Sequence, residues 1–212
     1  MGLSQISRVW LVLVACVMAL FSATLLAQGA PGGKKYVELS PVQPTEPGKV
    51  EVLEFFAYSC PHCAALEPLL EKWIKSLPPD VVVRRVPVAF NGSMRPLQQL
   101  YYSLEAMDRM DLNAKAFKAI HEEKKRVFTK PDIIAWVAEQ GVDRAKFEAM
   151  FDSFGVTSKV GRADQLVNAY KIEGTPSIAV AGRYVVSPSE TGGYQQTIDQ
   201  ADVLVRQVRA AK

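Results

Sequence analysis

Runs of apolar residues with two different periods divide this chain into regions. Residues 50–56 form a largely apolar run without strict alternation, which is typical of a central strand covered on both faces. A helical pattern follows over 64–77, and β-branched residues then fill 81–86. Strand, helix and strand at this short range predict a βαβ unit with a parallel strand pair. A short apolar patch at 36–39 predicts an edge strand ahead of this unit.

From residue 96 onward the apolar residues recur at helical spacing. Thr129 and Asp143 are expected to cap two of the helices, and a further helix is expected over about 158–170. We assign Phe154 to the apolar stripe of the helix that Asp143 caps. These stripes are better explained by packing between helices than by a ligand groove.

Strand character returns after Gly174. Residues 177–181 and 183–186 are joined across Gly182, which predicts a tight hairpin. The last periodic segment predicts a terminal helix from about Tyr194.

The helical block cannot pair with the strands, so we expect it to be an insertion. The fold class is α/β, with one α/β domain interrupted by an all-helical domain. We place the α/β domain at 34–91 and 165–212, and the helical insertion at 92–164.

The N-terminus has the pattern of a secretory signal peptide over residues 1–27. Arg8 precedes an uncharged run that extends to Ala27 and is followed by a polar, glycine-rich segment. An uncleaved membrane anchor and lipoprotein processing at Cys16 are the alternatives. Export with cleavage is the interpretation we favour.

Composition narrows the function further. The chain has 212 residues, of which 49% are hydrophobic, and a net charge of only +3, which does not indicate nucleic-acid binding. Of its 3 cysteines, Cys16 lies in the expected signal peptide. The mature chain would keep Cys60 and Cys63, which form one Cys-x-x-Cys motif. An exported protein with one such close pair uses it for reactivity or for a metal, rather than to stabilise a small fold.

The motif Cys-Pro-His-Cys at residues 60–63 follows a strand and begins a helix, which is typical of redox chemistry. Free N–H groups and the helix dipole favour a thiolate on Cys60. Pro61 suits the first turn, and His62 adds a donor or a positive charge near the same sulfur. Stabilising the thiolate stabilises the reduced form, which makes the disulfide a strong oxidant. Cys63 is then the resolving thiol.

Two other uses of the cysteine pair are less well supported. Zinc needs four ligands, and the two histidines that could join the cysteines are His62, inside the motif, and the distant His121. A structural disulfide closing so short a loop would remove little chain entropy. We therefore expect no metal and no cofactor.

Glu54 and the pair Thr175-Pro176 are the other candidate site residues. Glu54 interrupts an apolar strand shortly before the motif, and if buried it could accept or relay the proton moved during exchange; otherwise it lies at a strand edge in water. Glu67 is a weaker candidate of the same kind. Pro176 precedes a strand and leaves nearby backbone groups free to pair with an extended peptide; an ordinary turn is the alternative.

Together, the strand at 52–56, the Cys-Pro-His-Cys motif and Thr175-Pro176, separated by a long helical insertion, resemble the DsbA family of the thioredoxin superfamily. The resemblance implies a thioredoxin-like fold with an inserted all-helical domain. It also implies that Cys60 is the exposed nucleophile, Cys63 its buried partner, His62 the thiolate stabiliser and Pro176 a cis-proline facing them. Thr175 departs from the best-known form, which has valine there, and this change is expected to alter redox strength or substrate release.

By the same resemblance the chain is expected to be a monomeric thiol:disulfide oxidoreductase of the bacterial periplasm. It would donate its disulfide to newly exported, reduced and unfolded proteins, and a quinone-linked membrane protein of the DsbB type would reoxidise it. An isomerase or reductase of the same fold, a peptide-binding chaperone module and a relative of the glutathione transferases are the alternatives.

Overall fold

The computed structural model describes residues 35–211 of the chain. The expected signal peptide at 1–27, with Cys16, lies outside the described residues. Among residues 35–211, no helix combines the length and apolar character needed to cross a bilayer.

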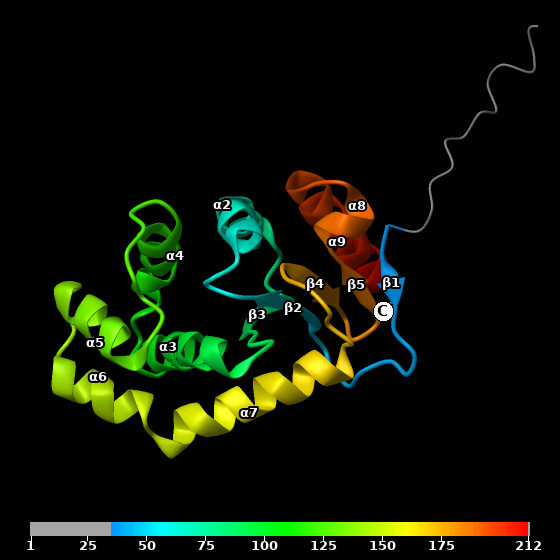
Figure 1. Ribbon diagram of the computed structural model, residues 1–212. Coiled ribbons are helices and arrows are strands. Elements are labelled where there is room, and N and C mark those ends of the chain that lie inside the picture. The colour runs from blue at the N-terminus through cyan, green and yellow to red at the C-terminus, as the bar shows by residue number, and fades with distance from the viewer. Residues whose placement is uncertain (1–34, 212) are drawn as a thin grey trace, which may run out of the picture. The chain divides into compact units, whose positions relative to one another are not determined.

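A five-stranded mixed sheet forms the centre of the fold, with strand order β1-β5-β4-β2-β3 (Figure 1). Its strands are β1 (Val37–Glu38), β2 (Val50–Phe56), β3 (Val81–Pro87), β4 (Ser177–Val180) and β5 (Tyr184–Val186). The pair β2–β3 is parallel and the other pairs are antiparallel. The predicted βαβ unit, edge strand and hairpin are therefore confirmed.

The helices fall into two sets along the chain. One set accompanies the strands: α2 (Pro61–Ser76), α8 (Pro188–Thr191) and α9 (Tyr194–Ala210). The other set is consecutive and lies together beside the sheet in Figure 1: α3 (Arg95–Ala106), α4 (Asn113–His121), α5 (Lys130–Glu139), α6 (Arg144–Phe151) and α7 (Phe154–Ala169). Two short 3-10 helices belong to the second set, η2 (Gly92–Met94) and η3 (Met110–Leu112). This is the α/β arrangement with a helical insertion that the sequence predicted.

Local hydrogen bonds explain where several helices begin. The side chain of Thr129 accepts from the N–H of Asp132, and that of Asp143 accepts from the N–H of Lys146, as predicted. The helix expected over 64–77 begins three residues earlier, because Pro61 fits the first turn and Cys60 is the N-cap.

The assignment of Phe154 was wrong. It is the first residue of α7 and its side chain is 86% exposed, so it does not belong to the stripe of α6. The hydroxyl of Ser153 accepts from the N–H of Val156 at 3.2 Å, and this cap starts α7 four residues before the expected position at 158. The short helix α8 was not anticipated.

The hairpin between β4 and β5 turns through Ala181 and Gly182, both with positive φ, 52° and 66°. Two such residues form the turn type that matches the twist of paired strands. A side chain at Gly182 would collide with the carbonyl oxygen of Gln43, so this position requires glycine for space as well as for conformation.

The sheet is buried on both faces, as the largely apolar, non-alternating sequence of β2 predicts. Val50 and Val52 belong to a core shared with α2 and α9, whereas Leu53 and Phe55 face a core shared with the helical insertion. Because side chains alternate along a strand, β2 joins the two cores. The indole N–H of Trp73 donates to Asp202 at 3.0 Å and ties α2 to α9.

Candidate active site

Cys60 lies where the chain leaves the sheet and enters α2. A turn follows β2 and is closed by the N–H of Cys60, which donates to the carbonyl of Ala57 at 3.0 Å. Cys60 is the N-cap residue and is half-buried, whereas Cys63, one turn further along, is fully buried. Both cysteines are free thiols in this structure. One sulfur is thus accessible to a reactant and the other is shielded.

The surroundings of Cys60 favour the thiolate. A hydrogen bond from the Cys63 thiol is the largest effect lowering the pKa of Cys60, which falls from 9.0 to about 5. The backbone N–H groups of Cys63 and His62 and the side chain of Thr175 lower this pKa further, against the opposing effect of partial burial. These donors belong to the first turn of α2 and to the loop before β4, so the fold supplies them at one point.

Cys63 has the opposite character. Burial raises the pKa of Cys63, and hydrogen bonding and charge repulsion from Cys60 raise it further. The proton shared by the pair therefore resides on Cys63 while Cys60 carries the charge. A pair of thiols with such different pKa values has one nucleophile, Cys60, and one resolving thiol, Cys63.

The loop before β4 brings Thr175 and Pro176 against Cys60. The bond between these two residues is cis. The thiol of Cys60 donates to the carbonyl oxygen of Thr175 at 3.3 Å, across 115 positions of sequence. The sequence alone did not decide the isomer of this bond or the contact.

His62 is exposed, and its ring is bonded away from the motif. Its Nδ1 atom lies 2.7 Å from the hydroxyl of Tyr194, the first residue of α9. The backbone N–H of His62, rather than its ring, is the group that hydrogen-bonds Cys60. Tyr194 was not among the predicted site residues. The sequence indicated only that it lies at the start of the terminal helix.

A surface groove of about 780 Å³ runs past His62 and the cis-proline. Its walls are the segment 170–177, residues from 187 to 194 and the edge of the sheet at β1. Its lining includes the apolar residues Leu39, Ile172 and Val185. A groove of this composition next to a reactive sulfur can hold an extended peptide.

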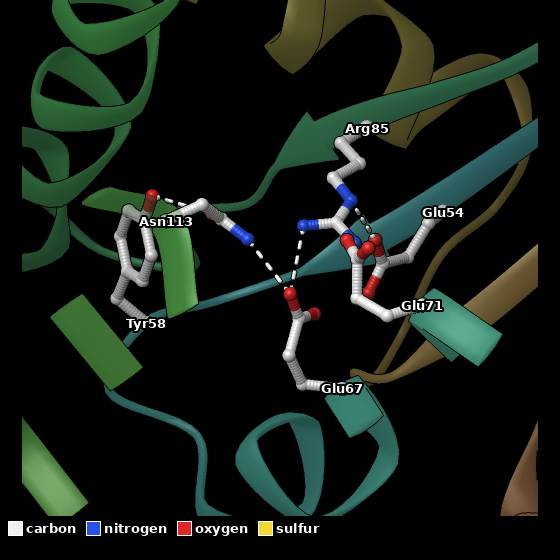
Figure 2. A network of polar contacts seen from close by, with 6 residues as sticks. All are labelled: Glu54, Tyr58, Glu67, Glu71, Arg85 and Asn113. Carbon is white, nitrogen blue, oxygen red and sulfur yellow. Dashed lines mark hydrogen bonds and ion pairs between the residues drawn. The ribbon is translucent and has the colours of Figure 1, made fainter. Parts of the chain in front are cut away.

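A largely buried cluster of charges lies around Arg85 and joins residues of β2, β3 and α2 (Figure 2). Glu54 and Arg85 are direct neighbours in the β2–β3 register. Arg85 Nε lies 3.1 Å from Glu54 Oε2, and its two Nη atoms lie 2.9 Å from Glu67 Oε1 and 2.6 Å from Glu71 Oε1. One cation therefore serves three carboxyl groups from a strand and a helix.

Burial dominates the titration of this cluster. It raises the pKa of Glu54 from 4.5 to about 8, and the Arg85 charge offsets only part of the effect. Burial also raises the pKa of Glu67. Glu54 is therefore buried, not at a wet strand edge; no contact among the described residues joins it to either sulfur.

Arg85 was missed by the sequence analysis. The available signal was a charged pair, Arg84-Arg85, inside a strand of β-branched residues. Only the parallel register identifies which of the two faces Glu54.

A thioredoxin-like sheet with a Cys-x-x-Cys pair at a helix N-terminus and a facing cis-proline defines the class of thiol:disulfide oxidoreductases. The thioredoxin family profile matches residues 40–200 of this chain. The chain belongs to the DsbA family of this class.

Similar proteins carry that family name. The thiol:disulfide interchange protein DsbA of Bordetella parapertussis is 53% identical over 195 residues, which cover 90% of this chain and 93% of the relative. That of Pseudomonas aeruginosa is 38% identical, with 91% and 92% covered. The crystal structure of Pseudomonas aeruginosa DsbA superposes with a TM-score of 0.81 at 38% identity, covering 87% of this chain and 97% of that one. Reduced DsbA1 from Neisseria meningitidis gives 0.74 at 31% identity, with 87% and 97% covered.

Proposed function

We propose that this protein donates the Cys60–Cys63 disulfide to reduced, unfolded proteins that have just been exported. The observation that carries this proposal is the unequal pair of thiols. The pKa of Cys60 is lowered to about 5, and that of Cys63 is raised. A reduced form stabilised in this way makes the oxidised form a strong disulfide donor.

The exchange proceeds in two balanced steps. A substrate thiolate attacks the sulfur of Cys60, the Cys60–Cys63 bond breaks, and Cys63 leaves as a thiolate that takes up a proton. A second substrate thiolate then attacks the substrate sulfur of the mixed disulfide and releases Cys60 as its stable thiolate. The substrate is oxidised by two electrons to a disulfide, and the cysteine pair is reduced by two.

The neighbouring residues have supporting roles in this scheme. His62 stabilises the Cys60 thiolate through its backbone N–H, and Pro61 lies beside it at the entrance to the helix. Thr175 and Pro176 form the ledge on which an extended segment of the substrate lies during exchange, in the groove described above. An unfolded substrate fits this ledge because its backbone is free to pair.

We propose Glu54 as the group that buffers the proton of the buried thiol. Its pKa of about 8 allows it to gain or lose a proton near neutral pH. Since no described residue links it to the sulfur, its action would be indirect. The exchange rate of a Glu54→Gln variant would then lose its dependence on pH near 8.

The proposal also covers export, domain boundaries, oligomeric state and reoxidation. Residues 1–27 direct export and are removed, and the mature protein acts as a monomer in the bacterial periplasm. Residues 34–91 and 165–212 form the redox domain and 92–164 the helical domain. A quinone-linked membrane protein of the DsbB type reoxidises the pair after each exchange.

The test uses the oxidised protein and a reduced, unfolded protein substrate with several cysteines. We expect stoichiometric oxidation of the substrate and a glutathione equilibrium that strongly favours reduced Cys60 and Cys63. Treated with oxidised glutathione, Cys63→Ala should accumulate a mixed disulfide on Cys60 and release one reduced glutathione, and Cys60→Ala should be inactive. A strongly reducing potential would favour the reductase alternative. Full activity of Cys60→Ala in disulfide formation by cells would favour the chaperone alternative.

A further inference from the structure

Tyr58 occupies the turn that delivers Cys60 to α2. The turn runs from Ala57 to Cys60 and is closed by their backbone hydrogen bond of 3.0 Å. Tyr58 is only 1% exposed, although it belongs to a loop. Because the turn sets the direction in which the chain enters α2, the position of the Cys60 sulfur depends on how firmly Tyr58 is held.

A single helix of the insertion, α4, holds Tyr58 at both ends. The Tyr58 hydroxyl donates to Asn113 Oδ1 at 2.7 Å (Figure 2), and the Tyr58 carbonyl oxygen accepts from His121 Nε2 at 2.7 Å. A carbonyl oxygen can only accept, so Nε2 carries the proton. Asn113 and His121 are the first and last residues of α4.

The middle of α4 packs on the same tyrosine. The ring of Phe117 lies 5.0 Å from the ring of Tyr58, and the His121 ring stacks on Phe117 at 6.3 Å. Positions 113, 117 and 121 are four residues apart, so they share one face of the helix. The whole face is therefore directed at one residue of the active-site turn.

Asn113 also connects α4 to the helix that Cys60 begins. Its Nδ2 donates to Glu67 Oε1 at 2.8 Å, the oxygen that also accepts from Arg85 (Figure 2). Glu67 belongs to α2. The insertion is thus bonded to the turn before Cys60 and to the helix after it.

We propose that Asn113 and His121 are positioning residues of the redox centre, which fix Tyr58 and thereby keep the Cys60 sulfur against the N–H groups of the first turn of α2. This inference deepens the proposed disulfide exchange and rests on it. It gives the helical insertion a direct part in setting redox strength.

The two redox states depend on this support to different extents. In the oxidised protein the covalent bond to Cys63 restrains Cys60. In the reduced protein the thiolate keeps its donors only as long as the turn and the helix hold their relative position. Loss of the support therefore weakens the reduced form more, and the disulfide becomes a weaker oxidant.

The test compares His121→Ala with His121→Gln in the full mature protein. We expect His121→Ala to shift the equilibrium with glutathione toward the oxidised protein by about three- to tenfold, the range for one lost hydrogen bond. The titration midpoint of the thiolate, followed by its ultraviolet absorbance, should rise in parallel. His121→Gln retains a side-chain N–H and should recover most of both values. Failure of the glutamine variant to recover them would overturn the role of the hydrogen bond.

Tyr58→Phe is an independent arm because it removes only the hydroxyl that Asn113 binds, and it should change both values in the same direction. Lys115→Ala, on an exposed position of α4, should change neither. Val137→Ala, a buried core change in α5, should lower stability without shifting the equilibrium. If Val137→Ala shifts it as much as His121→Ala, or if His121→Ala leaves it unchanged, the inference is wrong. A wild-type protein that does not exchange with glutathione would instead refute the proposed function.

Discussion

The ring of His62 is hydrogen-bonded to Tyr194, with 2.7 Å between Nδ1 and the phenol oxygen. The bond joins the N-terminus of α2 to that of α9 at the rim of the groove. Two hydrogen bonds hold the N-terminal end of α9 in place, because the hydroxyls of Thr191 and Thr197 both donate to the carbonyl oxygen of Gly193, the N-cap residue. Tyr194 therefore occupies one ring nitrogen of the histidine inside the redox motif.

Tyr194→Phe should make the protein a stronger oxidant. The change releases Nδ1, so the ring is free to turn toward the Cys60 thiolate and stabilise it. We expect a shift of about threefold toward the reduced protein in the glutathione equilibrium, as for one modest hydrogen bond. Tyr184→Phe, whose hydroxyl accepts only a 3.5 Å bond from Gln207, is the matched control. The effect of Tyr194→Phe should vanish in a His62→Ala background; a shift that persists there contradicts the explanation.

Thr175→Val should weaken the oxidant. The side chain of Thr175 lowers the pKa of Cys60, and valine has nearly the same shape but no hydroxyl. The carbonyl of Thr175, which accepts from the Cys60 thiol, is unaffected by the substitution. We expect the thiolate titration to move to higher pH and the glutathione equilibrium to move toward the disulfide. An unchanged titration midpoint would show that the hydroxyl does not reach the sulfur.

The stability of the reduced protein should depend on the ionisation of Cys60. Its pKa is 9.0 ordinarily and about 5 in the fold. Between these values the unfolded chain binds the extra proton, so the contribution of Cys60 to stability rises with pH across that window and is lost as pH falls through 5. Urea unfolding of both redox forms from pH 4 to pH 9 measures this dependence of stability on pH. The range extends about one pH unit below the window, so that it includes the loss of stability at low pH. The oxidised form lacks the thiol, so the stability of the reduced form relative to the oxidised form should rise with pH across this window.

Glu54 should produce the opposite trend, which is best measured in the oxidised protein. Its pKa is raised from 4.5 to about 8, so the folded state binds the extra proton between these values. Stability should therefore fall as pH rises through that window. Glu54→Gln keeps the shape of the protonated acid and should flatten the curve. An identical slope in wild type and variant would assign the titration to another group.

Removing the cation of the buried cluster should be costly. Arg85→Met leaves Glu67 without its ion pair at 7% side-chain exposure, and we expect a loss of about 3–5 kcal/mol in the free energy of unfolding. The adjacent Arg84 pairs with Glu46 at the surface, where both side chains are about half exposed. Arg84→Met should therefore cost about 1 kcal/mol or less. Equal losses from the two substitutions would contradict the assignment of a buried role to Arg85.

Much of the fold was predictable because its signals are local. Nearby residues identify each of these elements: the largely apolar run marks β2, the caps at Thr129 and Asp143 mark two helices, and Gly182 marks a turn. The errors had local causes of the same kind. The cap at Ser153 was overlooked, so Phe154 was assigned to the wrong helix.

For the active site, the sequence identifies the reactive residues, whereas the structure is needed to identify their contacts. The spacing and local context of Cys60 and Cys63 identify them as the reactive pair without any knowledge of distant residues. It also marked Glu54 and Pro176 as unusual for their positions. It could not show what these residues contact, because a contact across the fold depends on strand register and helix packing.

Three contacts could be found only from the folded arrangement: Arg85 rather than Arg84 faces Glu54, Tyr194 binds His62, and the two ends of α4 hold Tyr58. All three contacts have the same cause. The sequence gives the chemical type of each side chain, but the direction of the folded backbone determines which residue that side chain contacts.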